Sequence, residues 1–143
     1  MIYRNPLAVD HPLAGRFSSG TRFTFEAAHQ LPSLGPTHKR ARMHGHSYTV
    51  EVVLAADRLT AHGFVTDIDD LTPFGKFLSE ELDHRVLDEV VPFEPTAELL
   101  AQYLATWFIT NMEPQIPGRL VAVRISETPG SWVSFELDRA RYT

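Results

Sequence analysis

One stretch decides the fold: His44-Gly45-His46-Ser47-Tyr48-Thr49-Val50-Glu51-Val52-Val53-Leu54. Its apolar and polar side chains alternate, with Tyr48, Val50, Val52 and Leu54 on one face. A two-residue period of this kind predicts a half-buried β-strand, which we place from His46 to Ala56. Because residues two apart on a strand point to the same side, the two imidazoles at its start are aimed at one point.

A second strand is predicted just upstream, from Arg16 to Ala28, with apolar positions at Phe17, Phe23 and Phe25. This run leads directly into His29. If the two strands pair, His29, His44 and His46 converge. Three neutral imidazoles with an open fourth position form a catalytic zinc site. The alternative is a set of partly exposed histidines at a strand end.

The rest of the chain predicts two helices between two β-hairpins. Leu31 to Met43 has the composition of a loop, and residues 63–67 that of a turn followed by a short extended piece. Thr72 is the expected N-cap of a helix over residues 73–82, and Thr96 that of a helix ending near residue 112. The apolar stripe expected on the second helix consists of Leu99, Leu100, Tyr103, Leu104, Trp107 and Phe108. Residues 120–127 and 132–137 then flank a Pro-Gly turn. The β-β-α-α-β-β order predicts an α+β fold, a four-stranded antiparallel sheet with both helices on one face.

Composition narrows the class of protein. The 143 residues suit a single domain over 1–143, with residues 1–16 outside the core sheet. The net charge of −5 argues against a general nucleic-acid or membrane-surface binder. There is no cysteine, no apolar run of membrane-spanning length, and no signal-peptide pattern between Met1 and Gly20. We therefore expect a cytoplasmic enzyme or binding protein.

Six motifs follow one another in the sequence: Phe25-Glu26-Ala27-Ala28-His29, His44-Gly45-His46, Gly63-Phe64-Val65-x-Asp67, Leu82-Asp83-His84, Pro95-Thr96-Ala97-Glu98 and Ser126-Glu127-Thr128. Together they resemble the 6-pyruvoyl-tetrahydropterin synthase family, which includes the 6-carboxy-tetrahydropterin synthases. The resemblance extends from about Phe23 to Phe135. It implies the tunnelling fold, in which three subunits close a barrel and two trimers stack as a homo-hexamer.

The resemblance also assigns roles. It implies that His29, His44 and His46 bind Zn²⁺, which acts as a Lewis acid on a small-molecule pterin. Asp83 and His84 match a catalytic pair, and an Asp-His pair can relay protons. Without the family, that pair is more simply a surface pair at a helix end, where a cation is favoured.

Three further residues match positions near the pterin. Glu127 matches the glutamate that anchors the ring, since a carboxylate can accept two parallel hydrogen bonds from a guanine-like edge. Thr96 matches a threonine near the pterin, and Asp67 is a weaker candidate. Their alternative roles are an outer-face strand residue for Glu127, a helix cap for Thr96, and a turn residue or cap for Asp67.

The sequence departs from the family at the position of the catalytic base, the residue that accepts the proton. The family places a thiol four residues before the His-Gly-His motif, or in one subgroup a glutamate three residues before it. These positions are Arg40 and Ala41 here, and residues 30–43 contain no Asp, Glu or Cys. Arginine cannot accept the proton, because its pKa stays above about 12. We therefore predict a pterin-binding homologue without the standard synthase reaction.

Three interpretations stay open. The protein could be a zinc-dependent carbon–oxygen or carbon–carbon lyase on a dihydropterin, with His38 or His84 as the base. It could instead be a non-catalytic pterin carrier or sensor, or a ligand-free structural homologue. Third, Arg40 could bind an anion and so select a phosphorylated or carboxylated pterin, since guanidinium suits bidentate recognition of either group.

Overall fold

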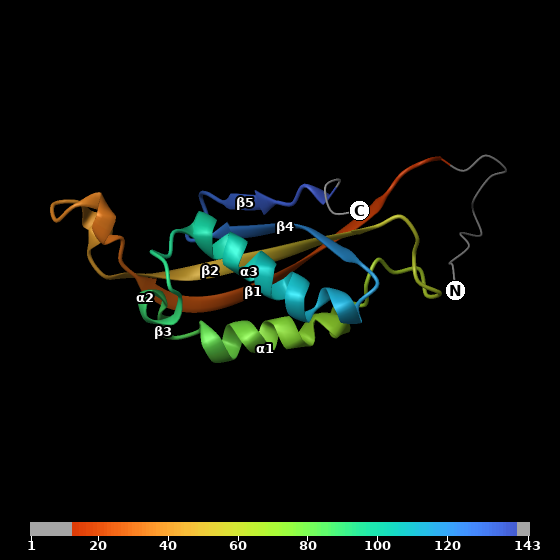
Figure 1. Ribbon diagram of the computed structural model, residues 1–143, viewed down its shortest axis with the longest axis horizontal. Helices are drawn as coiled ribbons and strands as arrows, with labels where there is room; N and C mark the ends of the chain where they lie inside the picture. The colour runs from red at the N-terminus through yellow and green to blue at the C-terminus, as the bar shows by residue number, and fades with distance from the viewer. Residues whose placement is uncertain (1–12, 140–143) are drawn as a thin grey trace.

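The computed structural model describes residues 13–139. Its sheet has five strands: β1 (Phe17–His29), β2 (His44–Ala56), β3 (Arg85–Val86), β4 (Arg119–Ser126) and β5 (Val133–Glu136). Their order across the sheet is β3-β1-β2-β4-β5, as Figure 1 shows. Of the predicted N-terminal extension, residues 1–12 lie outside the described range, and residues 13–16 form no helix or strand.

The helices are α1 (Thr72–Glu81), α2 (Leu87–Val90) and α3 (Ala97–Asn111). Four short 3₁₀ segments accompany them: η1 (Pro32–Leu34), η2 (Lys39–Ala41), η3 (Ile68–Leu71) and η4 (Glu113–Gln115). The two long helices, α1 and α3, pack against each other through Phe74 and Phe108, whose ring centroids are 5.4 Å apart. Within residues 13–139, no helix combines the length and apolar character needed to cross a membrane.

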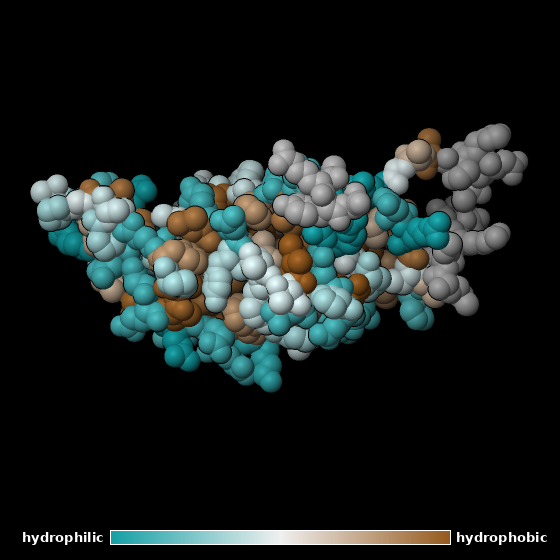
Figure 2. All heavy atoms as spheres, viewed as in Figure 1, coloured by the Kyte–Doolittle hydropathy of each residue, from teal (hydrophilic) through white to brown (hydrophobic). Residues whose placement is uncertain are grey.

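The core lies between the sheet and the two long helices. The predicted face of β2 is confirmed, since Tyr48, Val50, Val52 and Leu54 are each at most 1% exposed and belong to one cluster with residues of both helices. Apolar side chains gather in the middle of the face seen in Figure 2, and hydrophilic ones line its lower edge. The opposite face of the sheet is polar. There the Glu51 carboxylate accepts hydrogen bonds from Arg22 and Arg124 at 3.1 and 3.2 Å.

The α+β class, the antiparallel core of the sheet and the single helical face are confirmed, but the prediction of four strands was wrong by one. The two residues of β3 pair in parallel with Ala27 and Ala28 of β1. This added strand follows a sharp turn at His84, whose φ of 59° is in the left-handed region. The His84 N–H donates to the Glu26 carbonyl at 2.6 Å, which attaches the turn to β1. So short a strand has no periodicity to detect.

The two predicted helix caps had different outcomes. Thr96 caps α3 as expected, its Oγ1 accepting a hydrogen bond from the Leu99 N–H at 3.2 Å. The N-cap prediction for Thr72 was wrong. Its hydroxyl donates instead to the Asp69 carbonyl at 2.7 Å, because η3 runs directly into α1. Leu99, expected in the apolar stripe of α3, is 43% exposed.

Candidate metal and ligand site

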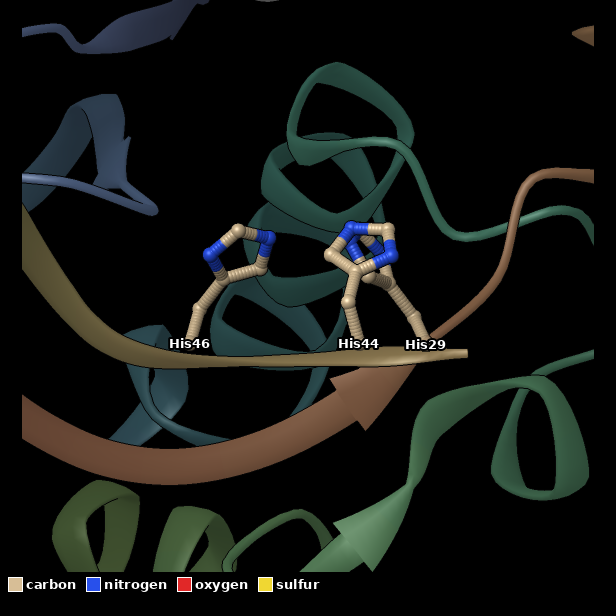
Figure 3. Close-up of side chains that lie close together, drawn as sticks. All are labelled: His29, His44 and His46. Atoms are coloured by element: carbon tan, nitrogen blue, oxygen red, sulfur yellow. The ribbon is translucent and has the colours of Figure 1, made fainter. Parts of the chain in front are cut away.

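The pairing of β1 with β2 brings the three histidines together. The register sets His29 opposite His44 and the small Ala27 opposite His46. Figure 3 shows the three imidazoles rising from the same side of these strands and gathered together. One ring nitrogen from each histidine lies within 4.8 Å of the others. The convergence predicted from strand periodicity is therefore present.

Hydrogen bonds to backbone carbonyls orient two of the rings. His29 Nδ1 lies 2.8 Å from the Pro95 carbonyl, and His44 Nδ1 lies 2.7 Å from the Arg42 carbonyl. A carbonyl can only accept, so each Nδ1 donates, and Nε2 is the ring nitrogen left to bind a metal. This is the arrangement that supports a metal-binding histidine.

The ring nitrogens that make no hydrogen bond are also suited to binding a metal. The Nε2 atoms of His29 and His46 are buried without a hydrogen-bond partner, a condition that is rare in native proteins and needs a cause. Burial is the main reason that the pKa of His46 is lowered, with further contributions from His29, His44 and Arg40 and an opposing one from Glu127. A lowered pKa keeps imidazole neutral, which is the form that binds metal.

The triad lines a cavity of about 780 Å³, a size typical of small-molecule sites. Its walls come from the loop after β1, the start of α3, and the turn between β4 and β5. Three further predicted site residues, Arg40, Thr96 and Glu127, line it together with the histidines. Residues distant in sequence thus meet in one pocket, as a binding site requires.

Glu127 follows the last residue of β4 and faces the triad. Its Oε2 lies 3.6 Å from His46 Nε2, and its side chain is 28% exposed. The carboxylate is therefore available both to the pocket and to solvent. Thr96 lines the same cavity while it caps α3, so both roles weighed for it in the sequence are compatible.

Two predicted residues act as caps elsewhere. His38 is the N-cap of η2, and its Nδ1 accepts a hydrogen bond from the Arg40 N–H at 3.1 Å. Asp67 is the N-cap of η3, and its side chain accepts a hydrogen bond from the Asp69 N–H at 2.9 Å. Neither lines the triad cavity. For Asp67, the cap weighed as its alternative role is the one that the geometry supports.

The Asp83–His84 pair is present but does not line the triad cavity. Asp83 Oδ2 is 3.0 Å from His84 Nδ1, and Asp83 Oδ1 accepts from the Glu26 N–H at 2.8 Å. The pair borders a shallower hollow with Glu26 and Ser47, and His84 lines it. Strand alternation puts Glu26 and Ser47 on the sheet face opposite the histidines. Within one protomer, His46 is the one triad residue that lines this hollow with His84, and the pair does not line the triad cavity.

Sequence reasoning missed several residues of the cavity. Lys39, Glu98, Ser131 and Trp132 line it, and none of them was assigned to a site. Glu98 had a signal, since it ends the Pro95-Thr96-Ala97-Glu98 motif. Ser131 and Trp132 had none, because their position depends on how the β4–β5 turn folds over the strand ends.

A histidine triad on this sheet, with two long helices on one face, defines a tunnelling-fold protein. The sequence pattern described as 6-pyruvoyl tetrahydropterin synthase matches residues 20–138, and the chain belongs to this family. It is 37% identical to a 6-carboxy-5,6,7,8-tetrahydropterin synthase of Synechocystis sp., over 74% of this chain and 82% of the relative.

Two other relatives show the breadth of the likeness. A dihydroneopterin monophosphate aldolase of Pyrococcus furiosus is 28% identical, over 82% of this chain and 93% of its own length. The structure of the Caenorhabditis elegans 6-pyruvoyl tetrahydropterin synthase superposes with a TM-score of 0.73 at 24% identity, covering 87% of this chain and 97% of that one. The superposition supports the fold, and the two sequence relatives support a pterin-related function.

Proposed function

We propose that this protein holds Zn²⁺ on His29, His44 and His46 and binds a dihydropterin in the cavity beside them. One observation supports this most directly: one ring nitrogen from each of the three histidines lies within 4.8 Å of the others, beside a pocket that contains a carboxylate. The buried Nε2 atoms of His29 and His46 make no hydrogen bond. All-nitrogen coordination with an open position suits zinc. When bound there, zinc would act as a Lewis acid toward oxygens of the ligand.

The protein's own residues orient the ligand. Glu127 accepts two parallel hydrogen bonds from the 2-amino group and the adjacent ring N–H of the pterin, a pairing that a carboxylate makes well. Thr96, at the start of α3, lies along the wall of the same cavity. With the guanine-like edge at Glu127, the side chain of the pterin extends toward the triad.

The standard synthase reaction is not expected from this pocket. Arg40 occupies the position of the family's thiol base and lines the cavity, and its charge contributes to the lowered pKa of His46. A guanidinium that faces the triad remains protonated and cannot remove a proton from carbon. The loop that supplies the base in the family therefore supplies a cation here.

Asp83 and His84 are proposed to serve the pocket of another copy. Neither residue lines the triad cavity of its own protomer, and His46 is the one triad residue that lines the hollow with His84, so association would bring the pair to a complete metal site. A homo-hexamer built from two barrel-forming trimers, as in the family, would do so and would also remove exposed sheet edges. The mass of the particle in solution, measured by light scattering, tests the assembly. A stable monomer would overturn it.

A second candidate function follows from the same cation. Arg40 and Lys39 both line the cavity, and one relative is named a dihydroneopterin monophosphate aldolase. A guanidinium recognises phosphate or carboxylate in a bidentate manner. The natural ligand would then be a phosphorylated or carboxylated pterin, bound more tightly than its neutral counterpart.

A panel of pterins in a thermal-shift experiment, with and without zinc, tests the proposal. A specific ligand of the native state raises the unfolding midpoint, and we expect zinc and a dihydropterin each to do so. Metal analysis of protein purified without chelator should give about one zinc per protomer. Failure of every pterin to shift the midpoint would favour a ligand-free structural homologue. Rapid conversion of dihydroneopterin triphosphate to a 6-pyruvoyl or 6-carboxy product would overturn the loss of the standard reaction.

A further inference from the structure

The wall of the triad cavity carries one large aromatic residue, Trp132. Among the described residues that line the cavity, it is the only Phe, Tyr or Trp, and it is 67% exposed. A pterin presents a polar edge and two flat faces, and Glu127 is proposed to contact only the edge. Flat heteroaromatic rings stack well on aromatic side chains, because every such ring has a π-face. Trp132 is therefore the candidate partner for the face of the ligand.

The connection between β4 and β5 brings Trp132 close to the proposed edge contact. Glu127 is its first residue and Trp132 its last, and the two strands stay paired up to their ends. Within the connection the Ser131 N–H donates to the Thr128 carbonyl at 3.4 Å, and the two hydroxyl oxygens are also 3.4 Å apart. One hairpin therefore brings a carboxylate and an indole to the same cavity.

A cation on β4 supports the indole. The Arg124 Cζ lies over the Trp132 ring, 5.8 Å from its centroid, and Arg124 Nη1 donates to the Glu51 carboxylate at 3.2 Å. A guanidinium over an aromatic face is attracted to it. Neither Arg124 nor Glu51 lines the triad cavity, so this support comes from outside the site. It fixes the indole before a ligand arrives, which lowers the entropic cost of binding.

We propose that Trp132 stacks on the face of the pterin ring and that Arg124 is the residue that positions it. The inference rests on the proposed pterin-binding function and deepens it. With Glu127 on the edge and Trp132 on the face, the site selects ligands that combine a guanine-like edge with a flat bicyclic ring. The competing explanation for an exposed indole beside β5, an edge strand of the sheet, is contact with a second copy of the chain.

Calorimetric titration of zinc-loaded protein with 7,8-dihydroneopterin measures the contact. Removal of an aromatic side chain that stacks on a nucleic-acid base weakens binding by roughly 5- to 150-fold. Trp132→Leu keeps apolar bulk but no ring, so we expect Kd to rise by about 10-fold, and Trp132→Phe should stay within about threefold of the unmodified protein. The control is Trp107→Phe, since Trp107 lies outside the cavity and stacks on Phe77 at 4.1 Å.

A pair of arginine variants tests the support of the indole. Arg124→Gln removes the cation over Trp132 and should weaken pterin binding by roughly 2- to 5-fold. Arg22 provides a matched control, because its Nε donates to the same Glu51 carboxylate at 3.1 Å but from β1, on the other side of β2. Arg22→Gln should therefore bind the pterin as the unmodified protein does. Equal affinities in the two variants would overturn the role of Arg124.

Two further measurements on the same samples separate stacking from other roles of Trp132. The ring current of a stacked indole should shift the proton NMR signal of the C7 hydrogens of the bound dihydropterin upfield, and Trp132→Leu should abolish this shift. The mass of the particle, measured by light scattering, should be the same in both proteins. An unchanged Kd in Trp132→Leu overturns the inference, as does a loss of affinity that accompanies dissociation of the particle. Pterin binding without the upfield shift overturns stacking but leaves the proposed function intact. Absence of pterin binding to the unmodified protein overturns both.

Discussion

Replacing Glu127 with alanine tests the orientation of the ligand most sharply. The carboxylate is proposed to accept two hydrogen bonds from the pterin, and bonds to a charged group are worth about 1.5–3 kcal/mol each. Because the Glu127 side chain is 28% exposed, water competes for it, and the lower end of that range applies. Two bonds at that value give about 3 kcal/mol, which corresponds to a weakening of roughly 100-fold in Kd at about 1.4 kcal/mol per tenfold.

Titration of zinc-loaded protein with a pterin, followed by its fluorescence or by calorimetry, measures this change. The control is Glu136→Ala, an exposed carboxylate on β5 that does not line the cavity, and it should bind as the unmodified protein does. Metal content should stay the same in both variants, because neither residue belongs to the triad. An unchanged Kd in Glu127→Ala would refute the assignment of the ring edge to this carboxylate.

Further predictions concern the loop, the metal, the cap and pH. Arg40→Cys restores the thiol of the family and should raise product formation from dihydroneopterin triphosphate by roughly 10²-fold; an unaltered rate would contradict the account of the loop. Zinc at about 100 times its Kd should raise the unfolding midpoint by about 5–10 °C, and a chelator should reverse the shift; equal midpoints would count against the triad. Thr96→Ala removes the cap of α3 and should cost about 1 kcal/mol, seen as a lower denaturant midpoint. The hydrogen bond from the Glu26 N–H is the main cause that lowers the pKa of Asp83, and His84 adds a smaller contribution. Asp83 therefore stabilises the fold at pH values above its ordinary pKa of about 3.9, and this stabilisation is lost as the pH falls through the lowered pKa. Asp83→Asn should therefore change the pH dependence of unfolding only in that acidic range, and a change near neutrality would contradict the assignment.

Strand periodicity, together with the pairing expected of the two strands, was sufficient to predict the histidine triad. His44 and His46 share a face by the two-residue period, and His29 joins them once β1 pairs with β2. Alternation likewise predicted the buried face of β2. Both results depend on long elements, in which each residue adds to the same pattern.

The placement of Asp83 and His84 could not be predicted in the same way. Their motif was visible, but the sheet face on which they lie depends on a left-handed turn at His84 and on two residues that pair in parallel with β1. These are long-range contacts with no local signature. Glu98 was missed for a related reason, since its access to the cavity depends on how α3 is held against β1.

The hydrogen bond between His29 and the Pro95 carbonyl would link the proposed metal coordination to the stability of a helix. Pro95 and Thr96 are adjacent: the Pro95 carbonyl orients the imidazole of His29, and the Thr96 hydroxyl caps α3. Loss of the metal would free that imidazole to rotate and weaken its hold on the carbonyl. Backbone amides in the first turn of α3 should then exchange with solvent faster in the apoprotein than in the zinc form. The free energy needed to order the first turn of α3 would therefore reduce the affinity for zinc, although this turn does not contact the metal.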